Sequence, residues 1–337
     1  MDVPRARFDH LLDMTDEQGT FEHARLAEPR RDHGYCTDDM ARVLLVSVRE
    51  PDSTSEVQLL VEASLRFLCE AQGPDGDYRN RMSELGYWQD RPTVEDCWGR
   101  SVWALGTAAA HAQDDRTRQI AVSQFERAAQ LRSPWRRAMA FATLGAAELL
   151  SLWPAHREAH ALVTAAVEEM PTHADDPGWP WPEPRLTYSN AVIPEAMIAA
   201  GAVLDHRPLL RHGLDLLGWL LQHETSDGHL SVTPVGGSGP GAVRPAFDQQ
   251  PIEVAALADA CARAASIDTD DQRWPDGIRN AVAWFLGGND VNHVMWDPTT
   301  GGGFDGLEAG GPNRNQGTES TLAVLSTLQH GRRLVRR

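Results

Sequence analysis

The sequence predicts an all-α fold in which helix hairpins close into a ring. Apolar residues recur at helical spacing along most of the 337 residues, and strand signals are sparse. A glycine turn followed by a helix start that carries acids or amides also recurs, at irregular spacing. Irregular spacing argues against a solenoid with a fixed period, and a closed ring needs no capping repeats.

The helical pattern can be followed along the chain. Ala41, Leu44, Leu45 and Val48 lie at i, i+3, i+4 and i+7, which places them on one apolar face of a helix. The same stripe recurs within 193–200 and 254–261. Further helices are predicted over 55–71, 95–112, 115–131, 134–152, 155–170, 207–223, 274–287 and 318–331.

Two stretches rich in Pro and Gly are predicted as long loops, from Pro171 to Pro184 and from Pro234 to Pro245. A short β piece is predicted over His229–Val232, after a glycine turn. No shift in composition marks a domain boundary. The sequence therefore predicts a single catalytic domain over residues 1–337.

Composition excludes several classes of function. The net charge is −17 and the chain contains no lysine, which rules out a Schiff-base lysine and a P-loop lysine. An acidic chain is poorly suited to nucleic-acid backbones. The four cysteines have no CxxC spacing and the histidines form no ligand motif, so neither a metal nor another cofactor is expected. With no apolar leader and no membrane-length apolar run, a soluble cytoplasmic protein is expected.

The first acidic helix start carries Asp38 and Asp39 after Thr37, which is predicted as the N-cap. Acids in a first turn complement the helix dipole by about 0.3–1 kcal/mol, which is a sufficient structural explanation. His33 and Tyr35 precede them, however, and a solvated cap needs no such groups, so both are predicted to bind substrate. Since neighbouring residues point in different directions on a helix, we expect one of the two aspartates to face a catalytic site.

The second acidic start follows Thr93. A helical ion pair with Arg100 explains Asp96 on structural grounds. The aromatic and polar residues around this start are also those that bind sugar rings and hydroxyl groups. The predicted substrate-binding residues here are Tyr78, Arg79, Asn80, Arg81, Glu95, Asp96 and Trp98.

Aromatic and polar residues are densest between Trp179 and Asn190. Prolines keep this segment out of a helix, and it is predicted either to bind sugar or to form a rigid packed loop. Sugars offer apolar C–H faces to indole rings and hydroxyl groups to amides and acids. The residues predicted to bind substrate are Trp179, Trp181, Glu183, Arg185, Tyr188 and Asn190.

Glu253 lies in the first turn of a helix that Pro251 opens, directly before the apolar stripe that begins at Val254. A carboxyl group near a core face is often partly buried, which favours its protonated form and a general-acid role. Gln249 and Gln250, which precede it, are predicted to bind substrate. Gln316 and Glu319, at the last such start, are also predicted to bind substrate, with capping as the alternative explanation.

These motifs resemble the six-hairpin, or (α/α)6-barrel, glycosidase superfamily. The matching segments are 33–42, 95–100, 181–190 and 250–253, and the chain is similar to bacterial mannoside-processing proteins. Met40 and Trp98 depart from the Asn and His usual in that group. Within it, the resemblance suggests a mycobacterial type of hydrolase acting on methylmannose polysaccharide, an endo-acting α-mannanase.

The resemblance and the acids together predict hydrolysis of α-mannosidic bonds in an intracellular (methyl)mannose oligo- or polysaccharide. Glu253 would protonate the leaving oxygen, and Asp38 or Asp39 would activate water, with inversion. The alternatives are a phosphorylase or glycosyltransferase-like enzyme on the same scaffold, with arginines holding phosphate, and a non-catalytic sugar-binding protein. An epimerase is disfavoured because no helix start carries paired histidines.

Overall fold

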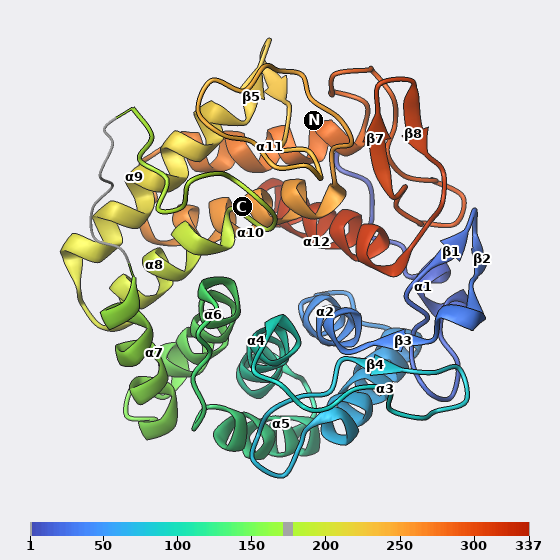
Figure 1. Ribbon diagram of the computed structural model, residues 1–337, viewed down its shortest axis with the longest axis vertical. Coiled ribbons are helices and arrows are strands. Elements are labelled where there is room, and N and C mark those ends of the chain that lie inside the picture. Colours follow the sequence, from blue (N-terminus) through green and yellow to red (C-terminus); the bar gives the residue numbers. More distant parts are fainter. Residues whose placement is uncertain (1, 171–177, 337) are drawn as a thin grey trace. The chain divides into compact units, whose positions relative to one another are not determined.

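The computed structural model describes residues 2–170 and 178–336, and helices make up most of it (Figure 1). Each helix predicted from the sequence is present. The five-residue α1 was not predicted, because it is too short to show a helical period. The helices are α1 (Asp9–Asp13), α2 (Thr37–Val48), α3 (Ser55–Ala71), α4 (Asp96–His111), α5 (Asp115–Ala128), α6 (Arg136–Leu152), α7 (Arg157–Glu169), α8 (Val192–Val203), α9 (Arg207–His223), α10 (Pro251–Ile267), α11 (Arg273–Phe285) and α12 (Thr318–Val335).

The strands are short and pair in antiparallel twos. They are β1 (Ala24–Arg25) with β2 (Glu28–Pro29), β3 (Tyr35–Cys36) with β4 (Arg81–Met82), β5 (Thr225–Ser226) with β6 (His229–Leu230), and β7 (Gly306–Glu308) with β8 (Gly311–Asn313). The β piece predicted near His229 is thus confirmed over two residues. The β3–β4 pair sets Cys36 opposite Arg81 and so ties the start of α2 to a segment more than forty residues away.

The chain divides into two compact units. One comprises residues 11–170 and 203–206 and contains α2–α7. The other comprises residues 1–10, 171–202 and 207–337, of which 1, 171–177 and 337 lie outside the described residues, and contains all but the last residue of α8 and all of α9–α12. They are called here the α2–α7 unit and the α9–α12 unit. The loop predicted from Pro171 therefore falls partly outside the described residues, and the single catalytic domain stays a prediction.

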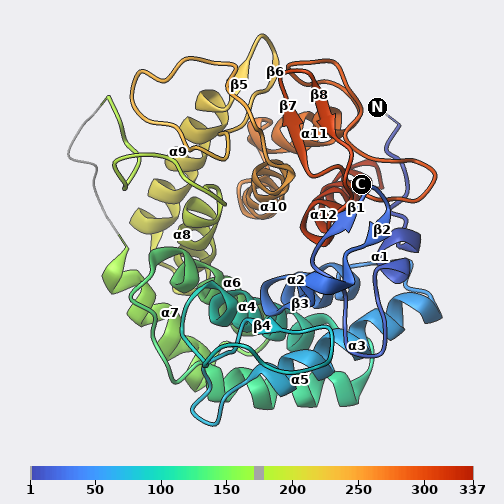
Figure 2. The ribbon, with the colours of Figure 1, turned by 45° about the vertical axis from the view of Figure 1, so that its right-hand side comes forward.

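In the α2–α7 unit, three consecutive hairpins stand side by side (Figure 2). Helices α2, α4 and α6 form its inner row, with α4 packed against both neighbours, and α3, α5 and α7 cover them. The inner helices are buried on nearly every side, whereas the outer ones are buried along one stripe. This difference explains why apolar residues run almost continuously in the inner helices.

In the α9–α12 unit, α10 packs against α11, α12 and α9, and α11 also packs against α12. Helices α8, α10 and α12 are deeply buried, with polar as well as apolar side chains inside. Trp274, Trp284 and Phe285 of α11 are fully buried and fill the space beneath them. Long loops join the helices of this unit, and Glu253 stands where one of these loops enters α10.

Candidate active site

The start of α2 is held by a hairpin rather than by its own cap. Cys36 is the N-cap and makes no side-chain capping bond, so the prediction of Thr37 as N-cap is wrong. Thr37 lies inside the helix, where its hydroxyl donates to the Arg79 carbonyl at 2.7 Å. The Asn80 carbonyl accepts from Thr37 N at 2.9 Å, and Asn80 Oδ1 accepts from Asp38 N at 3.3 Å. Asn80 thus takes over the capping that Thr37 was expected to provide.

Asp38 is a largely buried carboxylate, and one of its two oxygens has no hydrogen-bond partner among the described residues. Its Oδ2 accepts from Asn80 Nδ2 at 3.0 Å. Among the described residues, its buried Oδ1 has no hydrogen-bond partner, and Arg100 Nε lies 3.5 Å from it. The Arg100 guanidinium is itself fixed over the Phe141 ring at 4.1 Å. Burial raises the pKa of Asp38 even though Arg100, Arg42 and Asn80 act in the opposite direction.

Asp39 has a different environment from its neighbour. Its side chain is 2% exposed, and its Oδ1 accepts from Arg42 Nη2 at 2.6 Å, one turn along α2. A buried carboxylate with a guanidinium at this distance forms a strong ion pair. The two adjacent aspartates therefore point to different partners, as expected, and only Asp38 keeps an oxygen free of hydrogen bonds.

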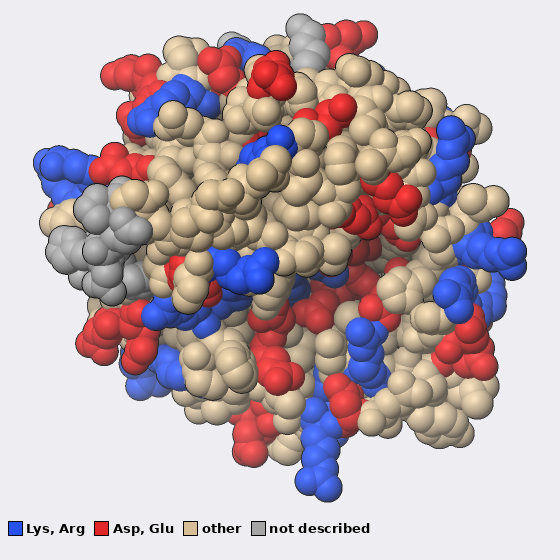
Figure 3. All heavy atoms as spheres, turned by 45° about the horizontal axis from the view of Figure 1, so that its top comes forward, with Lys and Arg blue, Asp and Glu red and all other residues tan. Residues whose placement is uncertain are grey.

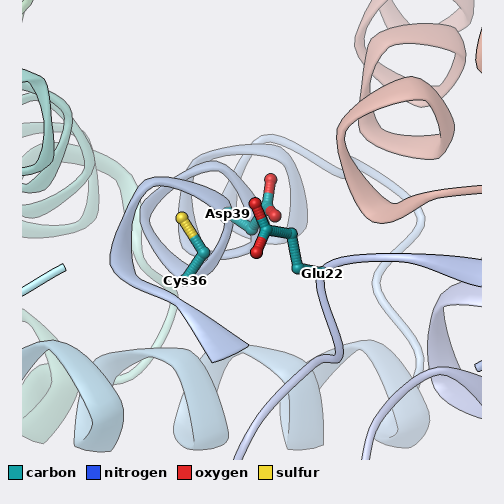
Figure 4. A group of neighbouring side chains, drawn as sticks. All are labelled: Glu22, Cys36 and Asp39. Carbon is teal, nitrogen blue, oxygen red and sulfur yellow. The ribbon is translucent and has the colours of Figure 1, made fainter. Parts of the chain in front are cut away.

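Glu22 and Cys36 lie beside Asp39 at the start of α2 (Figure 4). One ligand atom from each lies within 4.8 Å of the others, a spacing that would suit a metal ion. The two carboxylates already have cationic partners, because Arg81 pairs with Glu22 and Arg42 with Asp39. Burial and the adjacent aspartates raise the pKa of the Cys36 thiol well above its ordinary value, which keeps it protonated. These contacts argue for a structural ion-pair cluster.

Three aromatic residues predicted to bind substrate are core residues. Tyr35, Tyr78 and Trp98 are at most 1% exposed. Their polar atoms are used internally: Tyr35 donates to Asp16, Tyr78 accepts from Gln72, and Trp98 donates to the Ala128 carbonyl. Since buried rings have no face for a ligand, the structure corrects these three predictions. Sequence periodicity alone does not distinguish a stacking ring from a packed one.

The remaining predicted residues of this unit lie nearer the surface. His33 and Glu95 are exposed, Asp96 is half-buried, and Arg81 pairs with Glu22. Arg79 lies over the Trp88 ring, with its guanidinium 5.8 Å from the ring centroid. The structure therefore brings Asp38, Asp39, Asn80 and Arg81 together around one helix start, and it places His33 and Glu95 at the periphery.

Glu253, in the α9–α12 unit, is buried and anchors a turn. It accepts from the backbone N–H groups of Ser189 and Asn190 and, at 3.0 Å, from Asn190 Nδ2. Ser189 has a positive φ of 44°, so this turn needs an external anchor. The expectation was a partly buried carboxyl group that favours its protonated form and acts as a general acid. Both oxygens instead accept N–H bonds, because the Trp179–Asn190 segment folds onto the start of α10.

The rest of the Trp179–Asn190 segment is partly core. Trp179 and Trp181 are 8% and 3% exposed, and Trp179 Nε1 donates to the Glu183 carbonyl at 2.9 Å. Arg185 and Tyr188 are exposed. The packed-loop alternative therefore describes both tryptophan side chains, while the substrate-binding role of Arg185 and Tyr188 stays a prediction.

The predicted amides are also mostly internal. Gln249 is fully buried, donates to Asp290 at 2.5 Å and accepts from Trp284 Nε1 at 3.3 Å. Gln316 Oε1 accepts from the Thr300 hydroxyl at 2.9 Å. These contacts correct the substrate-binding prediction for Gln249 and Gln316, because their amide groups hold loops together. Gln250 and Glu319 are half-buried.

Sequence reasoning missed Glu22 and Asp248. Glu22 directly follows one of the glycine turns, but its proximity to Asp39 comes from tertiary folding. Asp248 has a buried Oδ1 without a hydrogen-bond partner among the described residues, and burial together with the nearby Glu308 raises its pKa. The sequence could have indicated Asp248 as a candidate site residue, because it directly precedes the predicted residues Gln249 and Gln250.

Comparison with known proteins identifies the fold. No family model matches the sequence, and no curated protein matches it significantly. Solved structures do match. A sugar epimerase from a ruminal bacterium superposes with a TM-score of 0.72 at 12% identity, covering 96% of this chain and 95% of that one. An α-1,6-mannanase of Salegentibacter sp., in complex with α-1,6-mannotetrose, superposes with a TM-score of 0.64 at 11% identity, covering 97% and 96%.

A D-mannose isomerase also matches, with a TM-score of 0.65 at 10% identity and coverage of 97% and 95%. These similarities confirm the predicted all-α (α/α)6-barrel fold. At such low identity they carry the fold alone, and hydrolysis of methylmannose polysaccharide stays a prediction. In the described part of the chain, no helix is long and apolar enough to cross a membrane.

Proposed function

We propose that this chain is a glycoside hydrolase that cleaves α-mannosidic bonds in an oligo- or polysaccharide, and that Asp38 activates the attacking water. The observation that carries the proposal is the state of the Asp38 carboxylate, which is largely buried, oriented by Asn80 and left without a hydrogen-bond partner at Oδ1. A general base needs a free lone pair at a defined position, and Oδ1 offers one.

The electrostatics support Asp38 rather than Asp39. A base works best when its pKa lies near the operating pH, and burial moves the pKa of Asp38 upward from the ordinary acidic value. The Asp39 oxygen that meets Arg42 is engaged in a buried ion pair. Arg100 and Arg42 lower the pKa of Asp38 against the larger effect of burial, and so favour its ionised form.

Two further points favour a mannosidic substrate. One structure with the same fold is an α-1,6-mannanase with bound mannotetrose, and its inactive variant has two consecutive aspartates replaced by alanine. This chain also carries two consecutive aspartates at the start of an inner helix. The resemblance to mannoside-processing proteins points to the same class, and methylated mannose chains are the finer candidate.

Glu253 is the second carboxylate of the proposal, as the sequence predicts, and would protonate the leaving oxygen. Ser189 and Asn190 hold it in one position, so proton transfer requires one of these hydrogen bonds to open. Water activation by Asp38 with separate protonation gives inversion of the anomeric centre. An endo-acting enzyme would release a range of shorter oligosaccharides.

Product analysis tests the reaction. The protein is incubated with α- and β-linked manno- and gluco-oligosaccharides, with methylated mannose chains, and with and without phosphate. We expect cleavage of α-mannosides, with the inverted anomer seen first by NMR. A sugar phosphate formed only with phosphate would show a phosphorylase instead. A product with all bonds intact but one epimerised centre would show an epimerase.

Substitution of each carboxylate tests its role. Asp38→Asn should lower kcat by about 10²–10⁴-fold, the usual contribution of a general base, and should cost less stability than Asp39→Asn, because Arg100 lies 3.5 Å from Asp38 whereas Arg42 lies 2.6 Å from Asp39. Asp39→Asn serves as the matched comparison. It should lower the free energy of unfolding by about 3–5 kcal/mol, because Arg42 loses its buried partner. Glu253→Gln should abolish turnover with the fold intact. Normal cleavage by Asp38→Asn would refute the assignment of the base.

A further inference from the structure

Two loops of the α9–α12 unit meet beside the end of α9. The first loop comprises residues 178–191 and the second loop residues 231–250. Leu186 N donates to the Ser238 carbonyl at 2.7 Å, and Ser238 N donates back to Leu186 at 3.0 Å. The Arg185 guanidinium donates to the Gly236 carbonyl. The two loops are thus tied together by backbone and side-chain bonds.

An aromatic cluster lies where the first loop covers α9. Trp181 stacks on Trp219 of α9 with ring centroids 6.0 Å apart, and Trp219 stacks on His223 at 4.9 Å. Trp179 meets the His223 ring edge to face at 5.5 Å. The second loop adds Arg244, whose charge acts on His223 and whose Nη2 lies 3.9 Å from the carboxylate of Glu224.

Three buried nitrogen atoms of this region have no hydrogen-bond partner among the described residues. They are Trp181 Nε1, His223 Nε2 and Arg244 Nη2, one each from the first loop, α9 and the second loop. The Trp181 side chain is 97% buried, since its exposed fraction is 3%. An unsatisfied buried donor costs about 1–3 kcal/mol, so three of them in one region are unusual for packing alone.

The charges of the region indicate the kind of ligand. Burial and Arg244 lower the pKa of His223 to about 4, so the imidazole is neutral at neutral pH. Glu224 offsets the charge of Arg244. The region therefore offers N–H groups and indole surface with little net charge. That combination suits a neutral ligand that is rich in oxygen acceptors and has apolar C–H groups, and it does not suit a phosphate.

We propose that the junction of the first loop, the second loop and the end of α9 is a subsite for one neutral pyranose unit. Its hydroxyl and ring oxygens accept from Trp181 Nε1 and Arg244 Nη2 and hydrogen-bond to His223 Nε2, and its C–H groups pack on the half-buried rings of Trp219 and His223. The inference rests on the proposed function in one respect, that the ligand is part of the oligosaccharide substrate.

Trp181→Phe tests the subsite because it removes the N–H group and keeps an aromatic ring. The probe is α-1,6-linked mannotetraose, titrated by calorimetry into Asp38→Asn protein with and without Trp181→Phe. We expect the Kd to rise roughly 3- to 10-fold, the value of one hydrogen bond, with no loss of thermal stability. Trp179→Phe is the matched control. Its indole N–H already donates to Glu183, so this change should lower stability with little effect on Kd.

The outcomes separate the subsite from the reaction. An unchanged Kd together with a lower melting temperature for Trp181→Phe would mean that the N–H group is satisfied within the protein, and would overturn the subsite. The probe could also bind to the unsubstituted protein without being cleaved, while Trp181→Phe still weakens binding. That outcome would support the subsite while the proposed hydrolysis fails. No binding by any of the proteins would overturn both.

Discussion

At the scale of single residues, position within one helical turn separates two identical side chains. Asp38 and Asp39 are adjacent, yet Asp38 faces Asn80 and Arg100 while Asp39 faces Arg42. Asn80 is the side chain that sets Asp38 apart from Asp39. It bonds both the backbone N–H and the carboxylate of Asp38, and Asp90 in turn holds the Asn80 backbone N–H at 2.7 Å.

Replacing Asn80 by alanine should change the pH profile in a defined direction. The Asn80 hydrogen bond favours the charged form of Asp38 and so lowers its pKa, against the larger effect of burial. Without this bond the pKa of Asp38 rises further. The limb of the kcat/KM profile that Asp38 governs should therefore move to higher pH. If Asp38 is the base, that limb is the acidic one, and activity at low pH should fall.

The control for this prediction is Gln89→Ala, an exposed residue of the same hairpin region. It should leave both limbs in place. A uniform loss of activity at every pH in Asn80→Ala, with both limbs unmoved, would mean that Asn80 only supports the fold. Movement of the alkaline limb would instead show that Asp38 acts as the proton donor.

At the scale of helices, α4 and α6 approach so closely that glycine is required. A Cβ atom added to Gly106 would lie 2.2 Å from the Gly145 carbonyl oxygen, and one added to Gly145 would lie 2.2 Å from the carbonyl oxygen of Val102. Both are backbone atoms, which cannot move aside as a flexible side chain can. Close contact of the inner helices therefore depends on these two positions.

Gly106→Ala should destabilise the protein despite the better helix propensity of alanine. The intrinsic gain is about 1 kcal/mol, but pushing the two helices apart should outweigh it, leaving a net loss of roughly 1–3 kcal/mol. Urea denaturation followed by circular dichroism measures the change. Gly310→Ala is the control, because an added Cβ there meets nothing within 4 Å. Equal stabilities for the two variants would contradict the packing argument.

The same scale shows what the sequence could predict. Helices such as α3 and α9 follow from a local apolar period that survives folding, and their predicted ranges agree with the structure. The capping of α2 could not be predicted, because Asn80 reaches it through the β3–β4 pair. The local sequence predicted Thr37 as the N-cap. In the structure Cys36 is the N-cap, and Asn80 accepts the hydrogen bond from the backbone N–H of Asp38.

The candidate site was predictable in part for the same reason. The acids at helix starts are local features, so Asp38, Asp39 and Glu253 could be found. Whether an aromatic ring packs in the core or binds a ligand depends on which distant parts of the chain cover it. The substrate-binding prediction for Tyr78 and Trp98 was therefore wrong. His223 and Arg244 carried no local motif, and only the meeting of the two loops shows that they lie near each other.

At the scale of the whole molecule, the dominant electrostatic property is excess negative charge. The chain has 48 acidic residues against 31 arginines, giving a net charge of −17. Acidic and arginine side chains are interspersed on the face shown in Figure 3. With so large an excess of acids, repulsion should still dominate the long-range term and oppose the compact state.

Salt should therefore stabilise the protein. Raising NaCl from about 0.01 to about 0.1 M shortens the Debye length from about 30 to about 10 Å, which weakens long-range repulsion more than close ion pairs. We expect a rise of several degrees in the melting temperature, measured by scanning calorimetry.

A variant with four exposed acids neutralised should melt higher at low salt and respond less to added salt, because part of the repulsion is already removed. Suitable positions are Glu62→Gln, Glu70→Gln, Asp75→Asn and Glu168→Gln. A melting temperature that falls with salt in both proteins would show instead that ion pairs such as Arg42–Asp39 outweigh the net charge.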